Sequence, residues 1–125
     1  MDNTHGTFCW NELMTRDLAD MKTFYTKTIG WKFEKFPGPM EPPYWLIKVG
    51  DKAIGGFFDM SGDEFRGMKE QWVTYVAVDD VDKRVKKAVA AGASLMKVLD
   101  IPHVGRIAML TQPDGALVAW KTPTM

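Results

Sequence analysis

Glu12 is the residue of this chain that is best placed for acid–base chemistry. Residues 7–14 are expected to form a strand with large side chains on both faces. Because side chains alternate along a strand, Trp10 and Glu12 share one face. A carboxylate that is desolvated beside aromatic side chains has a raised pKa and can act as a general acid or base. The alternative is structural, in which Glu12 pairs with Lys121, Arg106 or a backbone amide.

The other reactive side chains are two histidines and one cysteine. Neither His5 in the N-terminal tail nor His103 in a later loop has partners at the spacing of metal ligands. We interpret both as surface or loop side chains, and we keep His103 as a candidate ligand contact. Cys9 lies on the strand face opposite Trp10 and is expected to be a buried, small apolar residue. Trp10 is either a core aromatic residue or part of the lining of a pocket.

Charge and length limit the class of protein. Lys and Arg number 16, and Asp and Glu number 16, which argues against nucleic acid or an anionic membrane surface as a partner. The 125 residues suit one domain, without an apolar stretch near the length of a membrane span and without a signal peptide at the start. One cysteine cannot form an internal disulfide, so we expect a cytoplasmic protein. Five Trp, seven Phe, three Tyr and nine Met exceed the needs of a small core and favour a lined cavity or a subunit contact.

The elements that must position these residues occur twice along the chain. In the first half a helix runs from Asp17 to Gly30, and strands are predicted at 7–14, 31–36, 44–49 and 52–59. In the second half a helix runs from Asp80 to Gly92, and strands are predicted at 72–78, 94–98, 106–111 and 117–121. The capping aspartates are 80 − 17 = 63 residues apart, and the glycines that end the helices are 92 − 30 = 62 apart. These matched offsets indicate an internal repeat.

The repeat predicts an α+β fold of two βαβββ modules. Residues 1–125 would form a single domain, with a first module at 5–59, a polar linker at 60–70 and a second module at 71–122. Neither half can bury its sheet alone, so the halves must pack together or pair with another chain.

Several motifs resemble the vicinal oxygen chelate superfamily, the group of glyoxalases, bleomycin-resistance proteins and extradiol dioxygenases. They are Thr15-Arg16-Asp17-Leu18, Phe24-Tyr25, Gly30-Trp31 and Gln112-Pro113-Asp114-Gly115. The runs Trp10-Asn11-Glu12-Leu13 and Pro102-His103-Val104-Gly105-Arg106 are most similar to the glyoxalase-related branch. The resemblance covers nearly the whole chain. It implies the paired-module fold described above, with curled mixed sheets around a cup.

The resemblance also implies where a metal ion would be bound. In metal-dependent members four His, Gln or Glu side chains face the cup and hold a divalent ion that acts as a Lewis acid. The motif spacing places those positions at Trp10, Gly56, Val73 and Ala119, and their sequence neighbours are not His or carboxylate residues either. The family's metal site is therefore expected to be absent, and no cofactor is expected.

Alternation along the strands predicts what lines the cup instead. Strand faces place Trp10, Glu12 and Met14 there, together with Ile54, Gly56 and Phe58, then Val73, Tyr75 and Ala77, and finally Leu117, Ala119 and Lys121. Such a mostly apolar cup with few polar groups is typical of a small-molecule site. The candidate ligand-binding residues are Trp10, Glu12, Phe58, Val73, Tyr75, Ala119 and His103.

Three functional hypotheses follow. The first is a glyoxalase/bleomycin-resistance-like protein that binds a small organic molecule in the aromatic cup without a metal. The second is a metal-independent lyase- or isomerase-type enzyme with Glu12 as the acid–base residue. The third, a metal-dependent glyoxalase of the lactoylglutathione lyase type, conflicts with all four ligand positions. The expected partners are a small molecule and a second copy of the chain in a homodimer, with neither nucleic acid nor membrane.

Overall fold

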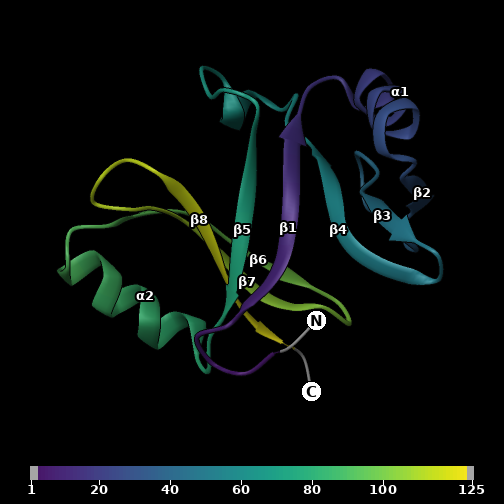
Figure 1. Cartoon of the computed structure of the whole chain (residues 1–125). Coiled ribbons are helices and arrows are strands. Elements are labelled where there is room, and N and C mark those ends of the chain that lie inside the picture. The colour runs from purple at the N-terminus through teal and green to yellow at the C-terminus, as the bar shows by residue number, and fades with distance from the viewer. Residues whose placement is uncertain (1–2, 124–125) are drawn as a thin grey trace. The chain divides into compact units, whose positions relative to one another are not determined.

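The computed structural model describes residues 3–123, whose elements follow the predicted order (Figure 1). The first half contains β1 (Phe8–Thr15), α1 (Leu18–Ile29), β2 (Lys32–Lys35), β3 (Trp45–Val49) and β4 (Lys52–Asp59). A 3-10 helix, η1 (Asp63–Phe65), precedes β5 (Gln71–Ala77), α2 (Val81–Ala90), β6 (Ser94–Ile101), β7 (Gly105–Thr111) and β8 (Leu117–Pro123). The predicted α+β class, with strand–helix–three-strand halves, is confirmed.

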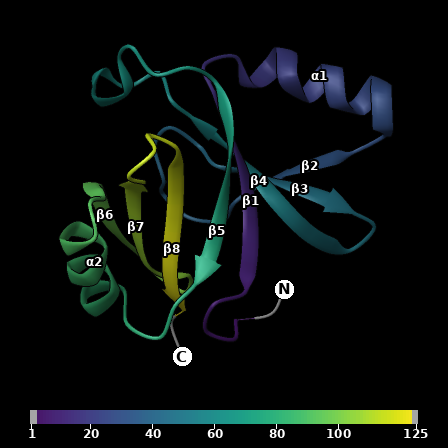
Figure 2. The ribbon, with the colours of Figure 1, turned by 60° about the vertical axis from the view of Figure 1, so that its left-hand side comes forward.

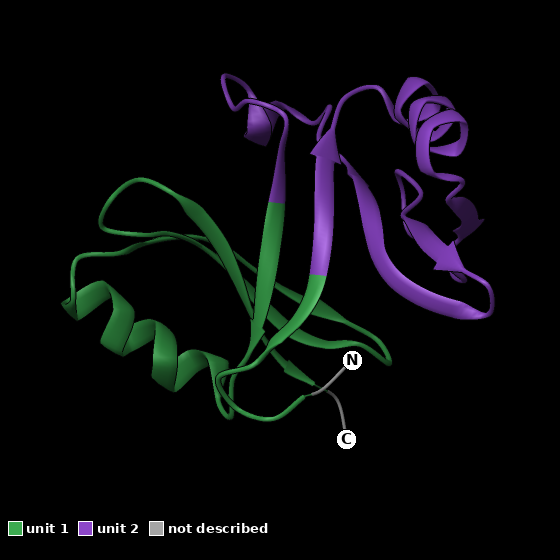
Figure 3. Cartoon of the chain, viewed as in Figure 1, with its two compact units in different colours: residues 1–10, 73–125 green, residues 11–72 purple. Residues whose placement is uncertain are grey.

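The chain divides into two compact units, which Figure 3 colours separately. Unit 2 is the continuous segment Asn11–Trp72, whereas unit 1 combines residues 3–10 with residues 73–123. Strands β1 and β5 therefore each contribute residues to both units. The boundaries differ from those of the modules expected at 5–59 and 71–122, because the start of β1 groups with the second half of the chain.

Unit 2 is a helix packed on one face of a small mixed sheet. Its strand order is β2-β3-β4-β1, in which β1 and β4 are parallel and the other neighbours are antiparallel. The core consists of Leu13, Ile47 and Phe57, against which α1 packs residues that include Met21 and Tyr25. Burying one such side chain contributes about 1.5–3 kcal/mol. This packing fixes one face of β1 and β4 toward the helix.

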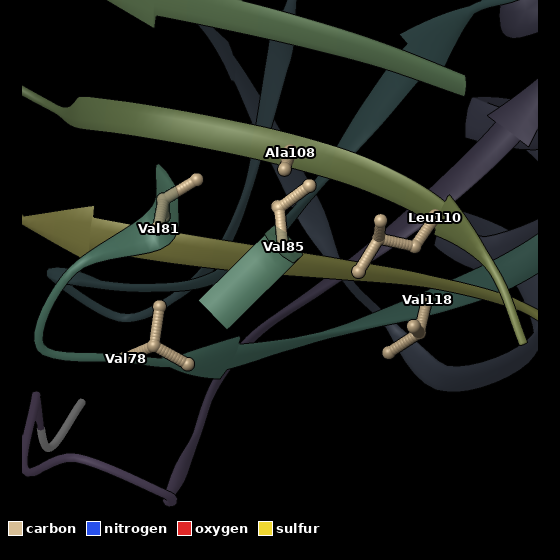
Figure 4. Close-up of a cluster of buried hydrophobic side chains, with 6 residues drawn as sticks. All are labelled: Val78, Val81, Val85, Ala108, Leu110 and Val118. Carbon is tan, nitrogen blue, oxygen red and sulfur yellow. The ribbon is translucent and has the colours of Figure 1, made fainter. Parts of the chain in front are cut away.

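Unit 1 repeats this arrangement with α2. Its strand order is β5-β8-β7-β6, with β5 and β8 parallel, and Figure 2 shows β6, β7 and β8 side by side next to α2. Six buried apolar side chains converge between α2 and these strands (Figure 4): Val78, Val81, Val85, Ala108, Leu110 and Val118. The helical spacing of its apolar residues thus places α2 as the sequence predicts.

Both helices begin at the predicted aspartates. The side chain of Asp17 accepts a hydrogen bond from the backbone N–H of Asp20 at 3.1 Å, and that of Asp80 accepts one from the N–H of Lys83 at 3.2 Å. Such a cap contributes about 1 kcal/mol. Gly30 ends α1 at φ 78°, a left-handed conformation that favours glycine. Neither α1 nor α2 is long and apolar enough to cross a membrane, and the same holds for η1 within the described residues.

Segment 60–70 is packed more tightly than a polar linker would be. Met60 is fully buried and Phe65 is 1% exposed, and the Phe65 ring meets the Phe58 ring edge-on at 5.3 Å. Arg16 adds a hydrogen bond from its guanidinium to the carbonyl oxygen of Phe65 at 2.8 Å. Met60 and Phe65 thus anchor a segment whose other residues are mostly polar.

Gly105 is the glycine on which the β7–β8 pairing depends most. Its φ is 142°, and a Cβ at this position would overlap the carbonyl oxygen of Thr122 on the neighbouring strand β8. Backbone atoms cannot move aside cheaply, so Gly105→Ala should lower the free energy of unfolding by more than about 2 kcal/mol. Urea denaturation followed by circular dichroism measures this change.

Gly115→Ala is the matched control for that experiment. Gly115 also has a positive φ, 93°, but nothing lies within 4 Å of the position that a Cβ would take. The control should lose only about 1 kcal/mol, the cost of the backbone conformation alone. Equal losses in the two variants would contradict the close approach of β8.

Candidate functional site in unit 2

Strands β1 and β4 of unit 2 present two faces of opposite character. In their parallel register Glu12 pairs with Gly56, Leu13 with Phe57 and Met14 with Phe58. Leu13 and Phe57 belong to the core beneath α1. Because side chains alternate, the paired residues before and after them point away from the helix. We call this side the Glu12 face, and it comprises Glu12, Met14, Gly56 and Phe58.

The Glu12 carboxylate is buried on this face. Glu12 is 3% exposed, and Met14 on the same strand face is fully buried. Burial of a carboxylate requires hydrogen-bond partners, and no buried side-chain nitrogen or oxygen within residues 3–123 lacks one. Arg106, one of the structural partners considered for Glu12, donates to Asp82 at 3.0 Å and to Asp100 at 2.6 Å. Its guanidinium therefore links α2 to β6 within unit 1.

A tyrosine that sequence reasoning missed lies beside Glu12. A Cβ placed on Gly56 would overlap the Oη, Cζ and Cε2 atoms of Tyr44, so the phenol fills the space that a side chain at Gly56 would take. Gly56 is the register partner of Glu12, and adjacent strands lie about 4.8 Å apart. The phenol of Tyr44 and the carboxylate of Glu12 thus belong to one site. Both side chains have interaction partners in the structure.

The β2–β3 hairpin holds Tyr44 in this position. The backbone N–H of Phe36 donates to the carbonyl oxygen of Tyr44 at 2.8 Å, and the two rings lie edge-on with centroids 6.2 Å apart. These contacts continue the antiparallel register in which Lys35 pairs with Trp45. They join the two residues that flank the proline-rich loop 37–43, so Tyr44 is held at the start of β3. The only sequence signal for Tyr44 is a tyrosine after two prolines, which does not indicate which strand it contacts.

Phe58 completes the Glu12 face with an aromatic surface. It is half-buried, and Phe65 of η1 packs edge-on against it. The site therefore combines one carboxylate, one phenol and apolar side chains, all within unit 2. This composition is typical of protein sites that bind small organic molecules.

Ile54 does not join the Glu12 face, although alternation along β4 predicts it. Ile54 packs against the Leu13–Ile47–Phe57 cluster on the helix side. The register between β3 and β4 shifts between Ile47 and Lys48, since Ile47 pairs with Gly55 whereas Lys48 pairs with Ala53. This bulge inserts a residue into β4 and changes the facing of the residues beyond it.

The other strand residues proposed as ligand contacts lie in unit 1. Tyr75 and Ala119 are register partners on the parallel strands β5 and β8, and Val73 precedes Tyr75 by two residues. All three are buried: Tyr75 is 6% exposed, Ala119 0% and Val73 1%. They lie on the face opposite the α2 core, against which the alternate residues Val76 and Trp120 pack. Trp10 is half-buried and also belongs to unit 1.

The histidines and the cysteine have distinct environments. His103 is exposed in the turn between β6 and β7, at φ 65°. The β7 residue that pairs with Ala119 is Met109, six residues further along, so His103 lies in the turn before β7 and not beside that pair. The Nδ1 atom of His5 accepts a hydrogen bond from the backbone N–H of Asp79 at 3.0 Å, which ties His5 to the start of the α2 half. Cys9 is buried as predicted, and burial raises the pKa of its thiol.

The four positions at which the family resemblance places metal ligands carry no suitable donor atoms in this chain. Trp10, Gly56, Val73 and Ala119 carry no imidazole, carboxylate or amide side chain. Within residues 3–123 no group of three or more His, Cys, Asp or Glu side chains could hold a metal ion. At Gly56 the space belongs instead to the Tyr44 phenol. The side chains at these four positions therefore do not fit a bound metal ion.

A polar depression of about 420 Å³ lies where β1 ends, bordered by Arg16 and by residues of segment 60–70. The two arginines that border it each form an ion pair. Arg16 contacts the carboxylate of Glu70 at 3.1 Å, and Arg66 contacts that of Asp63 at 3.0 Å. We interpret these contacts as structural, because they fasten segment 60–70 to the end of β1.

These features define an α+β protein of two similar units. In each unit one helix covers one face of a small sheet, and in unit 2 the opposite face carries polar and aromatic side chains. The chain belongs to the Glyoxalase/Bleomycin resistance protein/Dioxygenase superfamily, whose family model matches residues 7–119.

Curated relatives are similar over most of this chain but are much longer. The protein named "Putative glyoxylase CFP32" from Mycobacterium tuberculosis (strain CDC 1551 / Oshkosh) is 36% identical over 115 residues, which is 90% of this chain and 44% of that protein. The anthracycline biosynthesis protein DnrV from Streptomyces peucetius is 27% identical over 133 residues, covering 96% and 48% of the two chains. This chain thus spans less than half the length of the relatives that it matches.

Solved structures support the fold. Methylmalonyl-CoA epimerase from Mycobacterium tuberculosis has a TM-score of 0.59 at 15% identity, with 100% of this chain and 94% of that chain covered. Homoprotocatechuate 2,3-dioxygenase from Brevibacterium fuscum has a TM-score of 0.62 at 15% identity, with 97% and 33% covered. At this level of identity the likeness shows the fold alone.

Proposed function

We propose that this protein binds a small organic molecule at the Glu12 face without a metal ion. The observation that carries the proposal is the buried Glu12 carboxylate, which pairs in register with Gly56 where the Tyr44 phenol replaces a side chain. Hydrogen-bond partners compensate the burial of Glu12, and a carboxylate on an otherwise apolar strand face is a candidate for function as well as for structure.

The relatives' names guide the choice of ligands to be tested. One relative is named for anthracycline biosynthesis and another is named a glyoxylase. We therefore propose aromatic ketones and dicarbonyl compounds as the first panel. Phe58 supplies an aromatic contact, and Glu12 and Tyr44 supply polar contacts. In unit 1, the candidate ligand contacts are still Trp10, Val73, Tyr75, Ala119 and His103.

A metal-independent enzyme is the second candidate, and the burial of Glu12 favours it. A carboxylate beside a phenol on an apolar strand face can act as the general acid or base of a lyase or isomerase reaction. A metal-dependent glyoxalase comes last, because the four positions implied by the family carry no ligating side chain.

The assembly that we propose is a homodimer in the cytoplasm. No residue of α1 is fully buried, and Phe24 and Ile29 are 51% and 59% exposed. The matched relatives have more than twice this chain's length, so a second copy would supply a comparable mass of protein. Multi-angle light scattering of the purified chain should give twice its 14.1 kDa mass, whereas a monomer would contradict the dimer.

Metal content tests the proposed loss of the family's metal site. Protein purified without chelator should contain well below one equivalent of Ni, Zn, Mn or Fe per chain by elemental analysis. EDTA should leave the melting temperature unchanged, because no bound metal stabilises the folded state. One tightly held metal ion per chain would overturn this part of the proposal.

Glu12→Gln separates binding from catalysis. The amide keeps the size of the carboxyl group, so its melting temperature should stay within about 2 °C of the parent value. If the protein only binds, calorimetry detects compounds of the panel, and NMR spectra of those compounds show no product with either protein. Product that forms with the parent protein and disappears with Glu12→Gln would establish the enzyme instead.

Glu41→Gln is the control, because it makes the same chemical change at an exposed loop position. A large loss of stability for Glu12→Gln alone would support a purely structural Glu12. If the parent protein bound no compound of the panel, the proposed function would fail.

A further inference from the structure

We propose that helix α1 forms the two-fold interface of the homodimer by packing antiparallel against α1 of a second copy of the chain. This pairing rests on the homodimer proposed above and adds to it the surface, the direction of the helices and the residues that meet. It does not depend on which molecule the Glu12 face binds. Charge and apolar surface along one side of α1 favour it.

One side of α1 is packed and the other side is open. Met21 and Tyr25 pack against the core of unit 2, whereas Asp20, Phe24 and Lys27 are exposed. The i, i+4, i+7 spacing of these three residues places them on one face of a helix. We call this side the outward face of α1. Figure 2 shows the helix lengthwise, beside strands β2 and β3 of unit 2.

Phe24 is the apolar centre of the outward face. It is 51% exposed, although Phe is among the residues most often buried in folded proteins. Its ring meets the Tyr25 ring edge-on with centroids 4.9 Å apart, and Tyr25 stacks on Trp31 at 4.8 Å. Because these contacts hold the Phe24 ring, it loses little conformational freedom on association. Aromatic side chains of this kind are enriched at the centre of protein–protein interfaces.

The charges on either side of Phe24 match a second copy of the same helix. Asp20 lies in the first turn of α1 and Lys27 lies in its last turn. Within residues 3–123 neither of these two side chains forms an ion pair. A two-fold axis through the middle of the helix places Asp20 of each chain opposite the partner subunit's Lys27. The two Phe24 rings then meet beside the axis, offset along the helices by about 1.5 Å.

Helix α2 does not match a second copy of itself in this way. Its exposed residues include Lys83, Lys86 and Lys87. Its one aspartate, Asp82, is bound to Arg106 at 3.0 Å. A second α2 packed on this side would bring lysines near lysines, and like charges across an interface oppose association. Charge therefore favours α1 as the helix that faces the second copy.

Phe24→Glu tests the apolar centre of the interface. It places two like charges beside the two-fold axis, so the dissociation constant of the dimer should rise at least about 100-fold by sedimentation equilibrium. Val89→Glu is the matched control, because Val89 is an apolar residue of α2 that is 50% exposed. The control should keep the dissociation constant within about twofold of the parent value. Circular dichroism checks that both variants fold.

Charge reversal tests the direction of the two helices. Asp20→Lys and Lys27→Asp each set like charges opposite each other at two symmetric contacts, so each should raise the dissociation constant roughly tenfold. The variant with both changes restores opposite charges and should return to within about threefold of the parent value. Lys87→Asp is the control, because Lys87 lies in the last turn of α2 as Lys27 does in α1, and it should have no effect.

The possible outcomes separate this interface from the proposed function. Weaker dimers in Phe24→Glu and in both single charge reversals, with recovery in the double variant, support the antiparallel pairing of α1. A dimer that persists unchanged in Phe24→Glu overturns it, and loss of the dimer in Val89→Glu places the interface on α2 instead. A double variant that does not recover overturns the antiparallel direction. A monomeric parent protein overturns the pairing together with the homodimer, whereas calorimetry with the ketone and dicarbonyl panel tests small-molecule binding separately.

Discussion

The parallel pairing of β1 with β4 is the constraint on which the candidate site depends. The register sets Leu13 beside Phe57 and, one residue earlier, Glu12 beside Gly56. Because Leu13 and Phe57 are buried under α1 and side chains alternate along a strand, Glu12 and Gly56 lie on the opposite face of the sheet. A slip of one residue would bring Glu12 under the helix and expose the core residues. The stability of unit 2 and the position of its carboxylate are therefore set by the same interaction.

Membership of the superfamily explains the fold but not the activity. The family model covers residues 7–119, and the structural neighbours include an epimerase and a dioxygenase. One architecture thus carries different reactions, and the side chains on its strands distinguish them. In this chain those side chains are a carboxylate, a phenol and apolar groups within unit 2. The curated relatives, more than twice as long, contain further residues that this chain does not match.

The sequence by itself determined the order of the elements, the N-caps of both helices and the face on which Glu12 lies. These depend on local physics: aspartate oxygens cap helices, glycine adopts positive φ, and side chains alternate along a strand. It also predicted that Cys9 is buried, which is confirmed. Strand ends depend on partners as well as on local pattern. The sequence predicts that β6 ends at Val98, whereas the strand continues to Ile101 because its pairing with β7 extends as far as Gly105.

Only the tertiary structure decided which distant residues meet. The bulge between β3 and β4 turned Ile54 toward the helix, because an inserted residue reverses the alternation that sequence reasoning assumes. Phe65 became an anchor of segment 60–70 because it reaches Phe58, a contact that no local pattern encodes. Tyr44 entered the site because the hairpin returns it to the backbone of Gly56, which has no Cβ to exclude the phenol. Local propensity acts over a few residues, whereas the site depends on strand register, which forms only when the sheet assembles.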